Sequence, residues 1–298
     1  MIKDRQVITA VIVTVVLWAS AFVAIRVALP GFGVASLSVG RLLVASLVLV
    51  VAAPLLGVRR PASGDIPRII GCGLTGMTAY QLLLNAGERS VSAGTASLLV
   101  NTAPIVAAVL AFVLLREPLH RWGITGLLLG FAGAVVIALA QGTGLTPSLD
   151  ALLVLGAAIA QACFFVLQKP LLTRYRGVEV TCYAMWSGTA LSLPLLPALF
   201  RDAPHASTQS VVALLLLGIG PSAIGFVTWA YAQARLPVAT AANTLYLVPF
   251  LAIGIGWAVL GESVHPASLL GGVMVLAGVA VSRKTPYRAF PAAKPTMK

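Results

Sequence analysis

Two polar side chains lie in the middle of long apolar runs, each three residues before a proline: Asn101 precedes Pro104, and Tyr246 precedes Pro249. A proline inside a helix removes a backbone donor and leaves a carbonyl oxygen without its partner. In lipid such an oxygen is tolerated only where protein groups or cavity water satisfy it. The pattern therefore predicts two helix kinks beside a cavity, where the amide and the phenol bind a substrate. An interhelical hydrogen bond without ligand contact is the alternative.

Further polar and aromatic residues at membrane depth extend this candidate site. Together with Asn101 and Tyr246, the predicted substrate-binding residues are Trp18, Phe22, Tyr80, Gln81, Gln161 and Asn243. A cavity lined by aromatic rings and uncharged amides suits an amphipathic or neutral solute, including a zwitterion held by amides and helix-end dipoles.

Arg41 is the one charged residue that lies clearly inside a predicted helix. An ion within the membrane is a functional hypothesis by default, so Arg41 is a possible contact for an anionic group of the substrate. The same side chain could instead extend outward to the interface, or bond backbone carbonyls as a structural tie. The sequence leaves these interpretations open.

Glu117 and Glu262 are the acidic residues that most invite a role in proton transfer, but both fall at junctions between predicted helices. A carboxylate just before a helix accepts hydrogen bonds from free N–H groups and complements the helix dipole, which favours capping. No Asp or Glu lies near the centre of a predicted helix. The sequence therefore gives no support for proton coupling through a mid-membrane carboxylate, and facilitated diffusion or exchange stays open.

The composition explains why these residues must be placed in a bilayer. Of the 298 residues, 59% are hydrophobic and 9% are charged, and the mean hydropathy is +0.99. A soluble domain has about 25% charged residues, so this chain could not cover a water-facing surface and is predicted to be an integral membrane protein. The net charge of +12 does not indicate nucleic-acid binding, because the cations lie in short breaks between apolar runs.

Apolar runs of about 20 residues, the length that crosses a bilayer, predict ten transmembrane helices. The predicted spans are 7–29, 34–57, 67–87, 91–115, 121–141, 149–168, 178–200, 209–232, 238–260 and 265–282. With the N-terminus in the cytoplasm, all of the 20 lysines and arginines except Arg26, Arg41, Arg89 and Arg201 fall on the cytoplasmic side, so both termini are predicted there. The basic tail at 285–298 is expected to be disordered and held near anionic lipid headgroups.

The chain repeats itself at an offset of 145 residues. Identical pairs in this register include Pro104/Pro249, Glu117/Glu262, Gly126/Gly271 and Gly133/Gly278. The chain is thus predicted to consist of two five-helix halves, residues 1–142 and 143–284. Because five is odd, the second half enters the membrane from the opposite side, and such inverted repeats are typical of secondary transporters with a mid-membrane site. A duplication kept only for packing is the alternative.

These residues resemble the EamA family of the drug/metabolite transporter superfamily. The matching elements are Trp18-Ala19-Ser20-Ala21-Phe22, Arg41-Leu42-Leu43-Val44-Ala45 and, in each half, the proline, glutamate and two glycines named above. The resemblance covers nearly the whole chain and implies a ten-helix fold of two five-helix repeats. It also implies transport, in a family whose members export amino acids, other metabolites and toxic compounds. The second half lacks counterparts of Trp18 and Arg41, so the halves are expected to contribute unequally to the site.

Nothing in the sequence predicts enzymatic chemistry or a cofactor. All three histidines fall in predicted loops, and the three cysteines show no metal-ligand spacing. The sequence has no phosphate-binding loop, and neither the filter loop nor the ring of charges that a selective channel would carry.

The sequence therefore predicts a multi-pass transporter of the cell (cytoplasmic or inner) membrane that exports amino acids or related small metabolites by alternating access to a central cavity. Transport of drug-like, nucleotide-like or sugar-phosphate solutes is the alternative, and a membrane enzyme with an unrecognised site is the alternative of a different class. The expected partners are a small-molecule substrate and the lipid bilayer, without nucleic acid, and the expected state is a monomer or weak homodimer.

Overall fold

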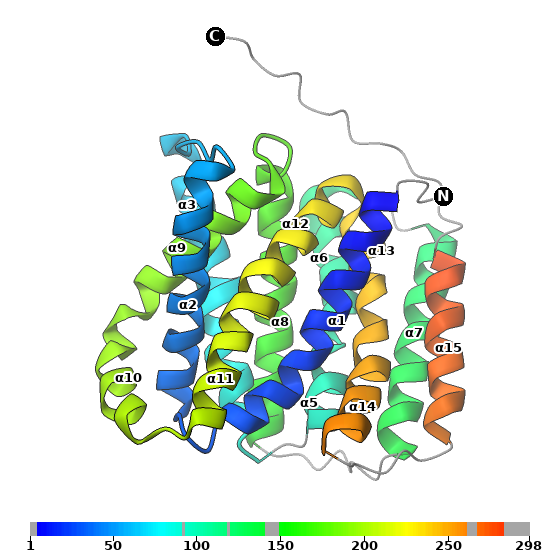
Figure 1. The fold of residues 1–298 in the computed structure, drawn as a ribbon. Helices are drawn as coiled ribbons and strands as arrows, with labels where there is room; N and C mark the ends of the chain where they lie inside the picture. The colour runs from blue at the N-terminus through cyan, green and yellow to red at the C-terminus, as the bar shows by residue number, and fades with distance from the viewer. Residues whose placement is uncertain (1–4, 91–92, 118–119, 141–148, 261–266, 283–298) are drawn as a thin grey trace.

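The computed structural model of the protein describes residues 5–90, 93–117, 120–140, 149–260 and 267–282, and these residues form helices and connecting turns without any strand (Figure 1). The predicted all-α architecture is therefore confirmed over this part of the chain. The predicted cap Glu262 and the predicted basic tail lie outside the described residues. The number of membrane crossings and the side of the termini stay predictions.

The first half of the chain forms two long helices, an interrupted rod, a pair of shorter helices and a further long helix. In order these are α1 (Arg5–Ala28), α2 (Val34–Leu55), η1 (Ser63–Asp65), α3 (Ile66–Cys72), η2 (Gly73–Ala79), α4 (Tyr80–Gly87), α5 (Ala93–Val100), α6 (Ala103–Leu115) and α7 (Arg121–Ala140). Because α3 runs through η2 directly into α4, residues 66–87 make one rod with a wide π-helical turn at its centre.

The second half follows a similar order. Its elements are α8 (Leu149–Leu171), α9 (Gly177–Ser192), η3 (Leu193–Leu195), α10 (Leu196–Asp202), η4 (Ala203–His205), α11 (Thr208–Leu217), η5 (Gly218–Ile224), α12 (Gly225–Arg235), α13 (Val238–Asn243), η6 (Thr244–Tyr246), α14 (Leu247–Leu260) and α15 (Ala267–Ser282). Here α11, η5 and α12 form the continuous interrupted rod, at residues 208–235.

The two interrupted rods carry the same irregularity at equivalent positions. η2 begins at Gly73 and η5 begins at Gly218, and each is a seven-residue π-helix. Their starts are separated by the 145-residue offset of the sequence repeat. Short π-helical turns of this kind occur frequently at functional sites. The shared irregularity supports a division into two related halves, although the boundaries of the halves stay a prediction.

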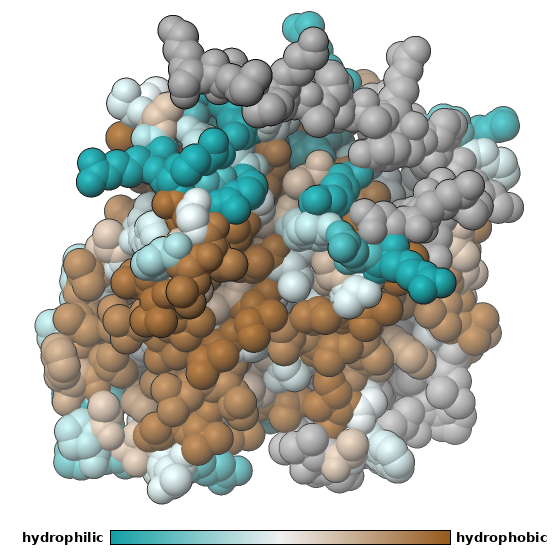
Figure 2. Space-filling model, turned by 45° about the horizontal axis from the view of Figure 1, so that its top comes forward, coloured by the Kyte–Doolittle hydropathy of each residue, from teal (hydrophilic) through white to brown (hydrophobic). Residues whose placement is uncertain are grey.

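Apolar side chains cover much of the surface. Figure 2 shows an apolar band over the middle of the visible face, with hydrophilic residues gathered mainly toward its upper part. Many large apolar side chains of the described residues are strongly exposed, and Leu55 reaches 86%. Four helical segments are long and apolar enough to cross a membrane: Arg5–Ala28, Val34–Leu55, Leu149–Leu171 and Thr208–Arg235. Lipid removes the cost of about 25 cal/mol per Å² that such surface would carry in water, so the band is the lipid-facing surface.

Polar contacts fasten the two halves to each other at both ends of the bundle. At the end that carries the α2–α3 connection, Arg59 Nε lies 2.9 Å from Glu179 Oε1 of α9. The two oxygens of Glu179 also accept hydrogen bonds from the backbone N–H groups of Arg59 and Arg176. At the opposite end, Asp202 accepts a hydrogen bond of 3.1 Å from the N–H of Gly33, just before α2. These contacts hold residues of the first half against residues of the second half.

Glycines allow α7 and α15 to pack side by side at one edge of the bundle (Figure 1). A Cβ atom added at Gly278 would lie 2.6 Å from the Gly130 nitrogen and 2.7 Å from the Gly126 oxygen. A Cβ added at Gly133 would lie 2.6 Å from the Gly271 oxygen. The repeated glycines thus let the last helices of the two halves approach within one chain, which is the packing role that small residues play between membrane helices.

Adding one methyl group at this contact should therefore destabilise the protein. We expect Gly133→Ala and Gly278→Ala each to lower the free energy of unfolding by about 1–3 kcal/mol, because the backbone of the facing helix must move. Thermal unfolding in detergent measures the effect. Gly254→Ala in α14 is the matched control, since a Cβ there meets nothing within 4 Å. Equal melting temperatures for all three variants would contradict the close contact.

Candidate functional site

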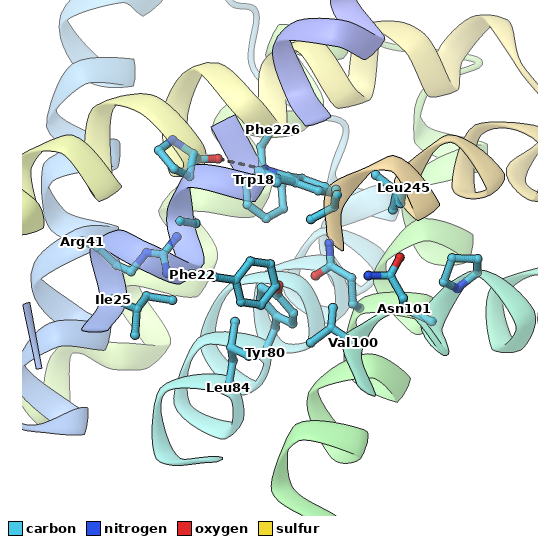
Figure 3. A pocket seen from close by; sticks show the side chains of 16 residues that line it. Trp18, Phe22, Ile25, Arg41, Tyr80, Leu84, Val100, Asn101, Phe226 and Leu245 are labelled. Carbon is cyan, nitrogen blue, oxygen red and sulfur yellow. Dashed lines mark hydrogen bonds between the residues drawn. The ribbon is translucent and has the colours of Figure 1, made fainter. Parts of the chain in front are cut away.

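A small cavity of about 40 Å³ lies at the centre of the bundle, between residues of the two halves (Figure 3). Seven of the residues predicted from the sequence line it: Trp18, Phe22, Arg41, Tyr80, Asn101, Pro104 and Gln161. They come from α1, α2, α4, α6, α8 and the break between α5 and α6. Further lining residues that sequence reasoning did not select include Leu84, Pro221, Phe226, Leu245 and Val248.

Trp18 connects the cavity wall to the π-helical turn of the second half. Its indole Nε1 donates a hydrogen bond of 3.1 Å to the Pro221 carbonyl oxygen in η5. Its ring lies parallel to that of Phe165, with a centroid separation of 6.3 Å and an interplanar angle of 4°. The N–H group of a tryptophan inside a bundle usually finds a hydrogen-bond partner, and the irregular turn provides one for the half-buried Trp18.

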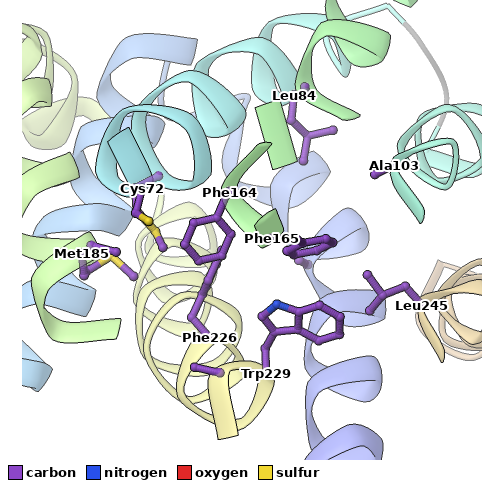
Figure 4. Packing of buried hydrophobic residues seen from close by; sticks show 14 of the residues in the cluster. Cys72, Leu84, Ala103, Phe164, Phe165, Met185, Phe226, Trp229 and Leu245 are labelled. Carbon is purple, nitrogen blue, oxygen red and sulfur yellow. The ribbon is translucent and has the colours of Figure 1, made fainter. Parts of the chain in front are cut away.

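An aromatic cluster closes the cavity on the side toward the C-terminal end of α12 (Figure 4). Trp229 packs against Phe165 with ring centroids 4.5 Å apart and against Trp18 at 5.4 Å. Phe226 lies 5.1 Å from Trp18 and 5.6 Å from Phe164. Ring pairs at these separations are mutually attractive beyond the area that they bury. The cluster therefore packs aromatic rings against one side of the cavity.

Arg41 points inward, toward the cavity (Figure 3). Its side chain is almost fully buried, its Nε donates a hydrogen bond of 3.1 Å to Ser222 Oγ in η5, and its Nη1 has no hydrogen-bond partner among the described residues. The possibility that Arg41 extends outward to the membrane interface is therefore wrong. The Nε atom therefore makes a structural hydrogen bond, whereas Nη1 is available to a ligand.

Two amides leave acceptors unpaired at the cavity. Asn101 donates from Nδ2 to the Ser97 carbonyl oxygen at 2.6 Å, and its Oδ1 is buried without a hydrogen-bond partner in the described structure. Gln161 Oε1 is unpaired in the same way. Buried polar atoms are nearly always hydrogen-bonded in folded proteins. Unpaired acceptors beside a cavity are therefore ready to receive donors of a bound molecule or of water.

Gln81, Asn243, Tyr246 and Pro249 do not line this cavity. Tyr246 is fully buried in a separate apolar cluster with Leu127 and Val275. Leu245 and Val248, on either side of Tyr246 in the chain, line the cavity instead. Asn101 and Tyr246 therefore occupy equivalent positions in the sequence but different environments in the fold.

The two prolines lie in the first turn of the helices that follow an irregular segment. α5 ends at Val100, and Pro104 is the second residue of α6. η6 ends at Tyr246, and Pro249 is the third residue of α14. A proline in the first turn of a helix loses no helical hydrogen bond, because the N–H groups there have no intrahelical acceptor. The first predicted kink is thus a break at residues 101–102, whereas the second is a 3₁₀ turn within a continuous helical segment.

Glu117 caps a helix, as the sequence predicts, but the helix belongs to the other half. Its Oε2 accepts a hydrogen bond of 2.9 Å from the Val238 N–H at the start of α13, and burial raises the pKa of its carboxyl group. On the other side of this turn, Lys169 Nζ donates to the carbonyl oxygens of Gln233 and Leu236 at the end of α12. Two charged side chains therefore hold the α12–α13 connection in place.

Glu88, just after α4, was not singled out by the sequence. It is 5% exposed, and neither carboxylate oxygen has a hydrogen-bond partner in the described structure. It lines a vestibule of about 580 Å³ together with Arg26 and Arg89. In the sequence Glu88 looks like an ordinary loop charge at the end of an apolar run, because its burial depends on packing between helices distant in the chain.

Comparisons with known proteins identify relatives over almost the whole chain. The model of the EamA-like transporter family matches twice, at residues 5–139 and 149–283. The "Probable terminal-alkyne amino-acid exporter" of Streptantibioticus cattleyicolor is 50% identical over 98% of this chain and 99% of its own length. The "Probable amino-acid metabolite efflux pump" of Salmonella typhimurium is 27% identical over 91% and 92%. A solved crystal structure of 21% sequence identity has the same fold, with a TM-score of 0.75 over 92% of this chain and 95% of its own.

The contrast between Trp18 and Tyr246 gives a stability test of these assignments. Trp18→Phe leaves the buried Pro221 carbonyl oxygen without its indole donor and should lower the free energy of unfolding by about 1–3 kcal/mol. Tyr246→Phe removes a buried hydroxyl that has no partner in the described structure, so it should be neutral or stabilising. Thermal unfolding of the two variants beside wild type measures both effects. A larger loss for Tyr246→Phe than for Trp18→Phe would contradict the assigned contacts.

Proposed function

The chain belongs to the EamA-like transporter family, and we propose that it exports amino acids or closely related small metabolites by alternating access to the central cavity. Members of this family are membrane transporters, not enzymes, and the chain is accordingly a multi-pass transporter of the cell membrane. The proposal includes ten crossings in two inverted halves with both termini in the cytoplasm. Two family matches and two π-helical turns at one offset support this arrangement.

The observation that carries the proposal is the composition of the cavity wall. Apolar and aromatic side chains make up most of it, and unpaired polar atoms of Arg41, Asn101 and Gln161 lie among them. Such a wall suits a small solute with an apolar side chain and a few hydrogen-bonding groups, which describes an amino acid. The names of two relatives, a probable amino-acid exporter and a probable amino-acid metabolite efflux pump, support the same class.

The size of the cavity supports a mechanism in which the halves move. Ligand pockets are typically about 300–1,000 Å³, whereas this cavity of about 40 Å³ has room only for water. Binding of an amino acid therefore requires the surrounding helices to separate. Since the cavity lies between elements of the two halves, motion of one half against the other would expose it first to one side and then to the other.

Phosphate-bearing substrates suit the wall less well. Among the residues that line the cavity in the described structure, Arg41 is the only cation. A nucleotide-like or sugar-phosphate solute carries about two negative charges at neutral pH and would require more positive charge at this depth. Amino acids, which are neutral overall as zwitterions, avoid this demand.

A growth assay tests the proposal. Bacteria overexpressing the protein should grow in inhibitory concentrations of one group of amino acids or analogues, because export lowers the concentration inside the cell. Asn101→Leu and Gln161→Leu should each reduce this protection at least tenfold, since each removes an unpaired acceptor from the cavity. Gly254→Ala is the matched control, and membrane content of each variant is checked by immunoblotting. Protection that survives both cavity substitutions would contradict the site, and protection against no amino acid would contradict the substrate class.

A further inference from the structure

Two buried ionisable groups, Arg41 and Glu88, line neighbouring spaces of the bundle without direct contact. Arg41 and Glu88 interact electrostatically, yet the structure records no hydrogen bond between them and no nitrogen–oxygen distance of 4 Å or less among the described residues. Arg41 Nη1 and both oxygens of Glu88 are buried and lack hydrogen-bond partners in this part of the chain. A buried ion that lacks a direct partner is costly unless another charge or a ligand compensates it.

α4 leads from the central cavity to the vestibule. Arg41 and Leu84 line the central cavity, and Glu88, one helical turn after Leu84, lines the vestibule. Arg26, whose side chain is exposed, lines the vestibule with Glu88. On the predicted topology the vestibule opens to the cell exterior. A solute leaving the cavity outward would therefore pass from Arg41 toward Glu88.

We propose that Arg41 and Glu88 form a two-point site for a zwitterion, in which the guanidinium group binds the α-carboxylate and the Glu88 carboxylate binds the α-ammonium group; this inference rests on the amino-acid transport proposed above. A free α-amino acid supplies one charge of each sign, separated by one carbon atom. Such a ligand compensates both buried groups at once. Charge-assisted hydrogen bonds of this type are about twice as strong as neutral ones.

The two-point site restricts the substrate class more narrowly than the cavity wall does. An N-acetylated amino acid retains the carboxylate but leaves Glu88 without its ammonium partner. An amino-acid amide retains the ammonium group but leaves Arg41 without its carboxylate. Each derivative would leave one of the two buried groups without a partner. A site with buried polar groups discriminates strongly against ligands that leave those groups unpaired. The side chain, in contrast, would meet only the apolar part of the wall.

Counterflow into liposomes tests the site directly. Purified protein is reconstituted, the liposomes are preloaded with unlabelled l-propargylglycine or l-leucine, and uptake of the radiolabelled amino acid is measured. The N-acetyl and amide derivatives are then added as competitors. In wild type, both derivatives should compete at least tenfold more weakly than the parent amino acid. Equal competition by the derivatives would overturn the two-point site while leaving amino-acid transport intact.

Substitutions assign each contact to its residue. Glu88→Gln should reduce counterflow at least tenfold and abolish the preference for the parent over the N-acetyl derivative, while the amide stays a weak competitor. Arg41→Gln should do the reverse, abolishing the preference over the amide. Arg68→Gln and Gly254→Ala, at exposed residues that line neither the cavity nor the vestibule, should retain wild-type counterflow and ranking. A variant that loses counterflow but still ranks the parent amino acid and its two derivatives as wild type does would overturn the assignment of that contact.

Two further outcomes separate the levels of the proposal. If Glu88→Gln or Arg41→Gln does not yield a monodisperse protein, Glu88→Asp and Arg41→Lys, which retain the charge, replace them. The order in which the derivatives compete for uptake by wild type then decides whether the two-point site exists. Absence of counterflow of either amino acid by wild type would overturn the proposed function itself, and with it the site. Counterflow without discrimination against the derivatives overturns only the site.

Discussion

The fold depends on one constraint: within a bilayer, every backbone N–H and C=O group must find its partner inside the protein. Regular helices meet this requirement unaided, and irregular backbone is tolerated only where protein or cavity water surrounds it. The irregular segments near the membrane centre obey this rule. The break after α5, the turn η6 and the π-helix η5 all contribute residues to the cavity wall, including Asn101, Leu245 and Pro221. The cavity therefore lies where the backbone departs from the regular helix.

The two halves share their pattern of interruptions but not their chemistry. Both halves line the cavity mainly with apolar side chains, but the first half adds Arg41, Tyr80 and Asn101, whereas the second adds only Gln161 as a polar side chain among the described residues. The related halves thus contribute unequally to the polar part of the cavity wall.

Local patterns in the sequence were sufficient to predict the helices, the repeat and most of the polar groups at the cavity. Long apolar runs leave little choice of secondary structure, so the described residues of the predicted spans are mainly helical, although spans such as 91–115 and 178–200 are divided into shorter helices. The position of Tyr246 outside the cavity was not predicted, because the periodicity of an apolar run does not show where a 3₁₀ turn such as η6 interrupts it. The burial of Glu88 was not predicted for another reason: in the sequence, a carboxylate at the end of an apolar run looks like any loop charge, and only the folded structure shows that other helices bury it.

The two charged side chains that bind the α12–α13 connection, Glu117 and Lys169, have a consequence for biogenesis. Glu117 is synthesised 121 residues before Val238, its hydrogen-bond partner, and Lys169 is synthesised 64 and 67 residues before Gln233 and Leu236. During insertion both side chains therefore lack these partners until α12 and the start of α13 have been made. The burial of these two charged groups thus belongs to a late stage of assembly.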